Sequence, residues 1–290
     1  ASVSIQEGHF VSANSLGFMG GYPTSRHYLS CSVIAGKDDA MQRDDWYSTS
    51  RNPDYIAAAE AIGDYAARRA LSRLGARKIK TCKVPVLFEA PLAASLIGNF
   101  AHAASGGSLY RKTSFLLDCL GRRIFPENMR ISERPHLPGG LASSMFDNDG
   151  VATRDRELVM DGVLQGYFLS AYTARKLGMA TTGNAGGCHN LIVQSGQHDF
   201  SGLLKKMGRG LLVTELLGQG VNYVTGDYSR GAAGYWVEGG EIQHAVEEIT
   251  IAGNLRDMFL NIVDVGNDVV VRGSRQVGSI LVAEMKIAGV

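Results

Sequence analysis

The sequence predicts an α+β fold, predominantly antiparallel β-sheet with helices packed on it. Two observations support this prediction. Glycine makes up 36 of the 290 residues and clusters at expected turns without a repeating period, which favours many tight chain reversals. Residues 213–255, the central ribbon, alternate apolar and polar side chains between glycine-rich breaks, which is the pattern of antiparallel hairpins. Two or three strands cannot bury enough apolar surface alone, so we expect the rest of the chain to cover this ribbon.

The N-terminal part of the chain predicts a sheet followed by a helix. Residues 2–51 are extended, rich in β-branched and aromatic side chains, and interrupted by turn residues, so we expect a β-meander. A helix over 53–74 is expected next. Asn52 can cap this helix, Pro53 suits its first position, and Gly75 can end it.

The middle of the chain predicts short strands, helices and turns in alternation. We expect an apolar strand over 84–88 and an alanine-rich helix over 92–104. Further expected elements are a helix over 109–117, hairpin turns at Asp149-Gly150 and Asp161-Gly162, a flexible loop over 181–190 and a short helix over 200–207. One possible division of the chain separates residues 1–135 from 136–290.

The central ribbon contains its own turns. Residues 221–225 are expected to form a strand, and residues 227–231 a turn in which Asp227 caps backbone amides and pairs with Arg230. The remaining expected elements are strands over 234–238 and 241–251 joined at Gly239-Gly240, a helix over 255–262 capped by Asn254, and a strand over 279–287.

Composition excludes several classes of function. The formal net charge is +1 and no lysine- or arginine-rich block occurs, which disfavours nucleic acid as a partner. The longest apolar region, 84–104, contains Glu89, Asn99 and His102 together with two prolines, so we expect a buried strand and helix and no membrane span. The four cysteines show no CxxC spacing, so reduced thiols in a cytoplasmic protein are expected.

Motifs for catalysis or metal binding are few. No His-Glu-x-x-His occurs. Cys188-His189 is the only local group of metal-ligand types, and we interpret it as a loop with a buried thiol and a surface imidazole. Ser229 lies in half of a nucleophile elbow, but Asp227 replaces the glycine that the motif requires. The residues themselves therefore indicate no catalytic residue.

Several long segments carry a resemblance. The run MGRGLLVTELLGQGVNYVTGDYSRGAAGYWVEGGEIQHAVEEITIAGNLRDMFLNIVDVGND, with SLYRKTSFLLDCLG, YTARKLGMATTGNAGGCHN and EMKIAG, closely resembles the PmbA/TldE branch of the TldD/PmbA family, named modulators of DNA gyrase. The resemblance covers residues 1–290. It implies the C-terminal part of a longer protein whose N-terminal region is absent here, as does a start in the middle of an expected strand. It also implies a cytoplasmic heteromeric protease.

The resemblance also implies that two kinds of subunit have different roles. A TldD-like subunit carries zinc on His-Glu-x-x-x-His and a C-terminal cysteine, and a TldE-like subunit pairs with it around a chamber that admits unfolded peptides. The corresponding positions here begin with Ile97 and Gly98, and only His102 matches. The first histidine is needed as a ligand and the glutamate as a general base. We therefore expect zinc in the partner subunit, no cofactor in this chain, and His102 as a weak metal candidate.

Three functions remain open from the sequence. The chain is expected to be a non-catalytic subunit that handles unfolded peptides with a TldD-like zinc subunit, and in isolation it could form a homodimer. The alternatives are a stand-alone metallopeptidase using His102, Cys188 and His189, and a regulator that contacts DNA gyrase. Candidate residues for a peptide groove or an interface are Thr214, Glu215, Asp227, Ser229, Arg230, Cys188 and His189.

Overall fold

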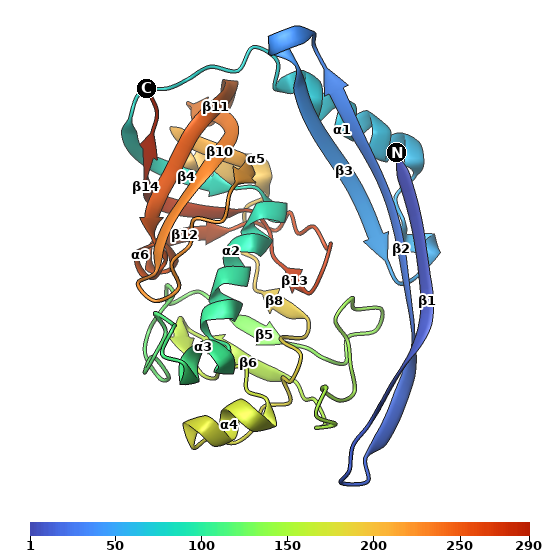
Figure 1. Cartoon of the computed structure of the whole chain (residues 1–290). Helices are drawn as coiled ribbons and strands as arrows, with labels where there is room; N and C mark the ends of the chain where they lie inside the picture. Colours follow the sequence, from blue (N-terminus) through green and yellow to red (C-terminus); the bar gives the residue numbers. More distant parts are fainter.

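Three β-sheets with intervening helices make up the computed structural model, which describes all residues, 1–290 (Figure 1). Strands account for 39% and helices for 21% of the residues, and most strand pairs are antiparallel. The predicted α+β fold is confirmed. None of the helices combines the length and apolar character that a membrane crossing requires.

The N-terminal sheet is the expected β-meander. It has the order β1-β2-β3, with β1 at Ser2–Ala13, β2 at Met19–Ala35 and β3 at Gln42–Ser50. In Figure 1 these long blue strands run along one side of the molecule. Helix α1, Ala59–Ser72, packs on β2 and β3 and buries Ile62, Ala66 and Ala70.

The predicted helix over 53–74 is wrong in its first turns. Pro53–Tyr55 forms a separate 3₁₀ turn, and the side chain of Asn52 caps that turn by accepting a hydrogen bond from the Asp54 amide. Ile56 is extended, so the chain turns before α1 begins at Ala59. The cap and the proline thus start a helical turn, but not the long helix.

The central sheet closes on itself. Its order is β11-β10-β9-β4-β14-β12, and β11 also pairs with β14 at residues 250–252, so five strands form a ring. Only β4 and β9 are parallel. The strands are β4 Cys82–Phe88, β9 Gly210–Leu217, β10 Asp227–Glu238, β11 Glu241–Asn254, β12 Ile262–Val265 and β14 Ile280–Ala288. The predicted strands at 84–88 and 279–287 and the ribbon of hairpins are confirmed.

Two local predictions within the ribbon are wrong. Residues 221–225 are irregular, with a single bridge from Val221 to Tyr228, because the Asn222 side chain accepts hydrogen bonds from the amides of residues 224 and 225. Residues 227–231 are not a turn but the start of β10. The turn at Gly239-Gly240 is confirmed, since both glycines have positive φ.

A third sheet lies below the central sheet in the view of Figure 1. Its order is β13-β8-β5-β6-β7, from β13 Arg275–Gln276, β8 Leu191–Val193, β5 Ile131–Glu133, β6 Arg156–Met160 and β7 Val163–Leu164. The turn at Asp161-Gly162 is confirmed, because both residues have positive φ between β6 and β7. β5 pairs with strands on both sides, so residues on either side of position 135 share one sheet.

Helices connect and cover these sheets. Helix α2, Ala90–Ala103, starts two residues before the prediction and lies between the central and third sheets (Figure 1). The other helices are α3 Gly106–Tyr110, α4 Ala171–Leu177, α5 Phe200–Met207 and α6 Leu255–Leu260. The predicted helix over 109–117 is wrong, since α3 ends at Tyr110 and Lys112 has positive φ. Asn254 caps α6 as predicted.

The core extends from the ring of strands through α2 to the third sheet. One cluster of 42 buried apolar residues joins these elements, and a cluster of seven lies under α5. The N-terminal sheet contacts the rest through an aromatic cluster around Phe146, through Arg272 on Trp46, and through ion pairs. Arg69 of α1 contacts Asp44 at 3.0 Å and Glu89 at 2.6 Å, and Arg73 pairs with Asp44 and Glu215. These charges fix β3 and α1 beside the start of α2.

Candidate functional site

A cavity of about 530 Å³ opens beside α2, where three segments that are distant in the sequence meet. One wall is α2 itself, with Asn99 and His102. Residues 219–230 form the second wall and residues 270–275 the third. Tyr47 of β3 also lines the cavity. We call this cavity the arginine pocket, because Arg230, Arg272 and Arg275 line it and no lysine, aspartate or glutamate does.

The three arginines of the pocket lack counter-charges. None of them forms an ion pair, and no Asp or Glu lines the cavity. The Nε atoms of all three, and Nη2 of Arg272, are buried without a hydrogen-bond partner. Leaving a buried donor unpaired costs free energy, and native proteins contain few such groups. The pocket therefore concentrates positive charge that the protein does not neutralise.

Packing holds two of these guanidinium groups in place. The guanidinium of Arg272 lies 3.6 Å from the ring centre of Trp46 and 4.1 Å from that of Tyr47, as in cation–π contacts. Burial lowers the pKa of Arg272 from its usual value. Arg275 lies over Gly98, where an added Cβ would stand 3.0 Å from its Cζ. Glycine at position 98 thus gives Arg275 the space to lie against α2.

Neutral polar groups complete the pocket. Tyr223 donates a hydrogen bond from its hydroxyl to Asn99 Oδ1 at 2.9 Å. The His102 ring stacks on Tyr223, with 4.0 Å between ring centres. Burial, with a contribution from Arg111, lowers the pKa of His102, so its imidazole is neutral at pH 7. The pocket thus combines three cations with a phenol, an amide and a neutral imidazole.

The pocket does not fit a catalytic zinc ion. Ile97, at the position of the first histidine of the zinc motif, is fully buried in the core and does not line the cavity. Gly98, at the glutamate position, has no side chain. Zinc needs several neutral or anionic ligands, whereas His102 here stands among three guanidinium groups. No three His, Cys, Asp or Glu side chains are grouped so that they could hold a metal ion, so His102, Cys188 and His189 do not converge.

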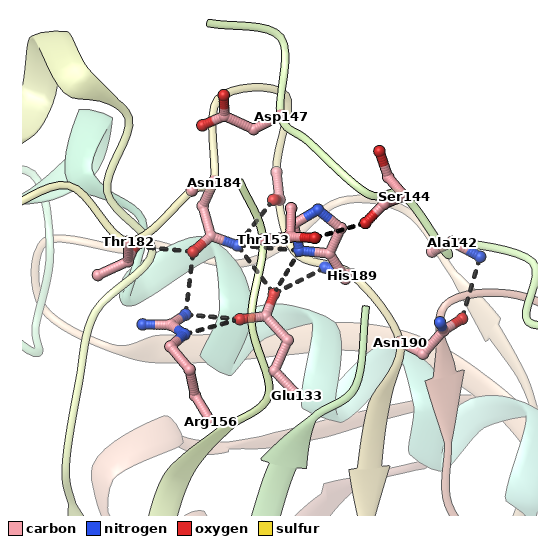
Figure 2. Close-up of polar contacts among 12 residues, drawn as sticks. Glu133, Ala142, Ser144, Asp147, Thr153, Arg156, Thr182, Asn184, His189 and Asn190 are labelled. Carbon is pink, nitrogen blue, oxygen red and sulfur yellow. Dashed lines mark hydrogen bonds and ion pairs between the residues drawn. The ribbon is translucent and has the colours of Figure 1, made fainter. Parts of the chain in front are cut away.

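A second polar group, the Glu133 cluster, lies at the ends of β5 and β6 and in the loop before β8 (Figure 2). Glu133 accepts hydrogen bonds at one oxygen from Arg156 Nε and Nη2, at 3.0 and 2.6 Å. Its other oxygen accepts from Asn184 Nδ2 at 2.8 Å, from the His189 amide at 2.8 Å and from the His189 ring at 3.1 Å. Every lone pair of this buried carboxylate is directed at a donor.

The electrostatics of Glu133 follow from these contacts. Burial alone raises the pKa of a carboxyl group, but the hydrogen bond from His189 and the charge of Arg156 outweigh it and hold the pKa of Glu133 at about 2. Arg156 also donates to Asn184 Oδ1 at 3.0 Å. The cluster is internally satisfied, so it holds the loops of the third sheet together and presents no free group to a ligand.

The prediction of a surface imidazole at position 189 is wrong. His189 is 8% exposed, because its ring and amide both bind Glu133. Cys188 is only half-buried, and burial raises the pKa of its thiol. The loop over 181–190, which was expected to be flexible, is tied to Glu133 through Asn184 and His189.

The candidate residues of the central ribbon do not converge either. Thr214 makes no side-chain hydrogen bond, and Glu215 pairs with Arg73. The predicted pair of Asp227 with Arg230 is wrong, because Asp227 accepts hydrogen bonds from Thr225 Oγ1 at 2.6 Å and Asn254 Nδ2 at 3.1 Å. These two bonds lower the pKa of Asp227. Ser229 is exposed on β10 beside them.

Of the predicted candidates, only His102 and Arg230 reach the arginine pocket. Sequence reasoning missed Arg272, Arg275 and Tyr223. A weak signal was available in the run Arg272-Gly273-Ser274-Arg275, where two cations flank a glycine in a segment without nearby acids. Nothing in the sequence indicated that this run lies opposite α2.

A larger cavity, of about 810 Å³, separates the β1–β2 hairpin from residues 136–145. Its arginine, Arg51, is satisfied, since it donates to the carbonyls of Gly140 at 2.8 Å and Leu141 at 3.1 Å and to the Thr24 hydroxyl at 2.5 Å. These bonds hold the loop against the N-terminal sheet. The cavity is wide and is also lined by Glu7, His9 and His136, but its arginine is already bound by the protein.

Comparisons with known proteins cover almost the whole chain. A family model described as the PmbA/TldA metallopeptidase C-terminal domain matches residues 81–289, and one described as the central domain matches residues 2–74. The two matches meet between α1 and β4. The possible division at 135/136 stays a prediction.

Two relatives are about half identical to this chain. Metalloprotease PmbA of Escherichia coli O157:H7 is 52% identical over 279 residues, 96% of this chain and 62% of the relative. A Metalloprotease PmbA homolog of Haemophilus influenzae is 50% identical over 290 residues, 100% of this chain and 64% of the relative. The chain therefore spans less than two thirds of the length of these relatives.

Solved structures share the fold. A Bacteroides thetaiotaomicron protein superposes with a TM-score of 0.94 at 29% identity, covering 99% of this chain and 65% of the other. A Thermotoga maritima protein gives a TM-score of 0.91 at 35% identity, covering 99% and 68%. The names of both suggest modulation of DNA gyrase. TldE from Thermococcus kodakarensis gives 0.85 at 24% identity, covering 99% and 68%, which shows the fold alone.

Proposed function

Because the chain belongs to the PmbA/TldD metallopeptidase family, we propose that it is a non-catalytic subunit of a TldD/TldE-like peptidase complex. One observation carries this proposal. At the two positions where the zinc motif requires a histidine and a glutamate, this chain has Ile97 in the core and Gly98 beneath Arg275. A ligand and the general base for a zinc-bound water are therefore both absent from the site.

Local electrostatics support the same proposal. Three unpaired guanidinium groups around His102 repel a divalent cation, and no carboxylate offsets them. On this proposal the zinc and the hydrolytic step belong to a TldD-like partner subunit in the cytoplasm. This chain contributes its fold and its surfaces to the enclosure of an unfolded peptide.

The N-terminal sheet supports a role in association. β1 is a twelve-residue edge strand, and Val3, Ile5 and Val11 on it are 71%, 63% and 67% exposed. Long apolar edge strands readily pair with another strand. The hairpins of the central ribbon have fewer free strand edges for pairing with a peptide than expected. β10 lies between β9 and β11, and β14 pairs with part of β11. Pairing with a second polypeptide is therefore assigned to the β1 side.

Reconstitution with a zinc-bearing homologue tests the proposal. We expect the two chains to co-purify, peptide hydrolysis to require both, and a chelator to abolish it through the partner's metal. Variants Thr214→Ala, Asp227→Asn and Arg230→Gln show whether ribbon residues contribute to turnover. If hydrolysis by the partner is the same with and without this chain, and the two do not associate, the subunit role is wrong.

The names of the relatives favour a second candidate, a metallopeptidase that acts alone. Metal analysis of the purified chain separates the two candidates. Stoichiometric zinc, together with chelator-sensitive hydrolysis by the isolated chain, would replace the subunit proposal.

The names of the structural neighbours favour a third candidate, a regulator that contacts DNA gyrase. The net charge of +1 does not indicate DNA itself as the ligand. Capture of gyrase by this chain in the absence of the zinc subunit would support direct contact.

A further inference from the structure

We propose that the arginine pocket is an oxyanion-binding site, and that its ligand is the carboxylate of a peptide. The peptide as the source rests on the proposed function, whereas the oxyanion site does not. Gly98 and His102, which the family resemblance places at positions of the zinc motif, both line this pocket.

Polar atoms without hydrogen-bond partners are concentrated on the arginines of this pocket. Five buried side-chain nitrogen or oxygen atoms in the whole protein lack a hydrogen-bond partner, and four of them belong to Arg230, Arg272 and Arg275. Buried donors on charged groups are costly to leave unpaired. Their concentration on the arginines of one cavity shows that the protein itself supplies few acceptors for this group of cations.

No acidic side chain lines the pocket to compete for these arginines. The only other orphan atom is Glu89 Oε2, and Glu89 is already bound to Arg69 through its other oxygen at 2.6 Å. Glu89 and Asp45 act on Arg272 electrostatically but do not contact it. The arginine forks are thus available to an external group, and a planar guanidinium matches a carboxylate or a phosphate in a bidentate manner.

Two of the arginines are held in place by packing before any ligand binds. Arg272 is fixed on the faces of Trp46 and Tyr47, and Arg275 is fixed over Gly98. A ligand therefore pays little to order these long side chains. The three Nε atoms and Nη2 of Arg272 are shielded from solvent, so an anion in the cavity binds through the remaining guanidinium N–H groups.

The size and lining of the cavity favour a peptide over a small ion. A volume of about 530 Å³ exceeds what a single carboxylate or phosphate fills. The same cavity includes apolar surface from Pro91, Val221 and Val270. A carboxylate at the arginines with apolar side chains beyond it fits both parts of the lining.

Binding to this chain alone tests the proposal, with isothermal titration calorimetry at low salt. The probes are an acetylated tetrapeptide with a free C-terminal carboxylate, the same peptide as its C-terminal amide, and inorganic phosphate. We expect saturable binding of the free acid, binding at least about tenfold weaker for the amide, and weakening of the free acid's binding as salt is raised. Saturable binding of phosphate without binding of either peptide would retain the oxyanion site and reject the peptide as its source.

Variants locate the binding. Arg275→Gln is expected to weaken binding about tenfold or more, because it removes one charged donor. Gly98→Glu keeps all three arginines but supplies a carboxylate beside Arg275, so it should also abolish binding. Arg209→Gln is the matched control, since Arg209 is 70% exposed and lies outside the pocket.

Two results would overturn the proposal. One is that no probe binds the unmodified chain saturably at millimolar concentration. The other is that Arg275→Gln and Arg209→Gln reduce binding equally, which would indicate a general effect of charge. Because no zinc subunit is present in the titration, failure to associate with one leaves the binding result unaffected.

Discussion

The Glu133 cluster and the arginine pocket show two opposite treatments of charge within one chain. In the Glu133 cluster a carboxylate that is 1% exposed meets Arg156, Asn184 and His189, and every oxygen lone pair finds a donor. In the arginine pocket, four buried guanidinium nitrogen atoms have no acceptor, and no carboxylate pairs with the three arginines. Both are conspicuous groups of polar side chains, yet only the second leaves free capacity for a ligand.

A structural cluster therefore differs from a binding site in whether its polar groups already have hydrogen-bond and ion-pair partners. The presence of reactive residue types does not distinguish the two. Cys188-His189 was a candidate metal site in the sequence because thiols and imidazoles bind metals. Its histidine is committed to Glu133. Of the three arginines only Arg230 was a predicted candidate, and none of the three forms an ion pair.

The sharpest way to test the comparison is to remove the carboxylate of the Glu133 cluster. Glu133→Gln should lower the free energy of unfolding by about 3–5 kcal/mol, because Arg156, which is 11% exposed, is left as a buried charge without its partner. Urea denaturation at pH 7 measures the change. Glu157→Gln is the control. Glu157 pairs with Arg134 near the surface, so this substitution should lower the free energy of unfolding by less than about 1 kcal/mol. Equal losses in the two variants would contradict the structural role of the cluster.

The next largest expected effect is the loss of stability at low pH that protonation of Glu133 causes. The pKa of Glu133 falls from 4.5 to about 2 on folding, so its contribution is present in full above about pH 5 and is lost as the pH falls through about 4.5 to 2. This linkage amounts to about 2 kcal/mol between pH 6 and pH 3. Thermal or urea unfolding over that range should show a shallower acid slope for Glu133→Gln. An unchanged slope would show that the pKa of Glu133 is not lowered in the folded state.

Removing a charge from the arginine pocket should not destabilise the protein as removing the charge of Glu133 does. Arg275→Gln is expected to change the free energy of unfolding by less than about 1 kcal/mol, or to raise it slightly, because no ion pair is broken and repulsion between the arginines is relieved. Urea denaturation without added anions measures this. A loss as large as that of Glu133→Gln would mean that Arg275 has a structural partner.

The smallest expected effect is at Ser229. Its side chain is exposed on β10 and makes no hydrogen bond, so Ser229→Ala should alter stability by less than about 0.5 kcal/mol. It should also leave peptide hydrolysis by the reconstituted pair unchanged. Loss of hydrolysis in this variant would revive the interpretation of a nucleophile elbow.

Local chemistry made much of the fold predictable. The turns at Gly239-Gly240 and Asp161-Gly162 need positive φ, and the cap at Asn254 needs a side-chain acceptor, so each is specified within a few residues. The same reasoning failed at residues 221–225, where Asn222 binds the amides that a strand would have used. It failed again after Asn52, because a cap specifies where a helical turn starts but not how far the helix continues.

Residue types and their near neighbours were sufficient to predict the fold class, the hairpins of the ribbon and several turns and caps, because each of these depends on contacts within a few residues. The tertiary structure alone decided which charges are paired. Arg230 and Arg275 lie 45 residues apart in the chain but line one cavity, and His189 and Glu133, 56 residues apart, share a hydrogen bond. Electrostatic and hydrogen-bond energies depend on distances in space, and the folding of the sheets around α2 sets those distances.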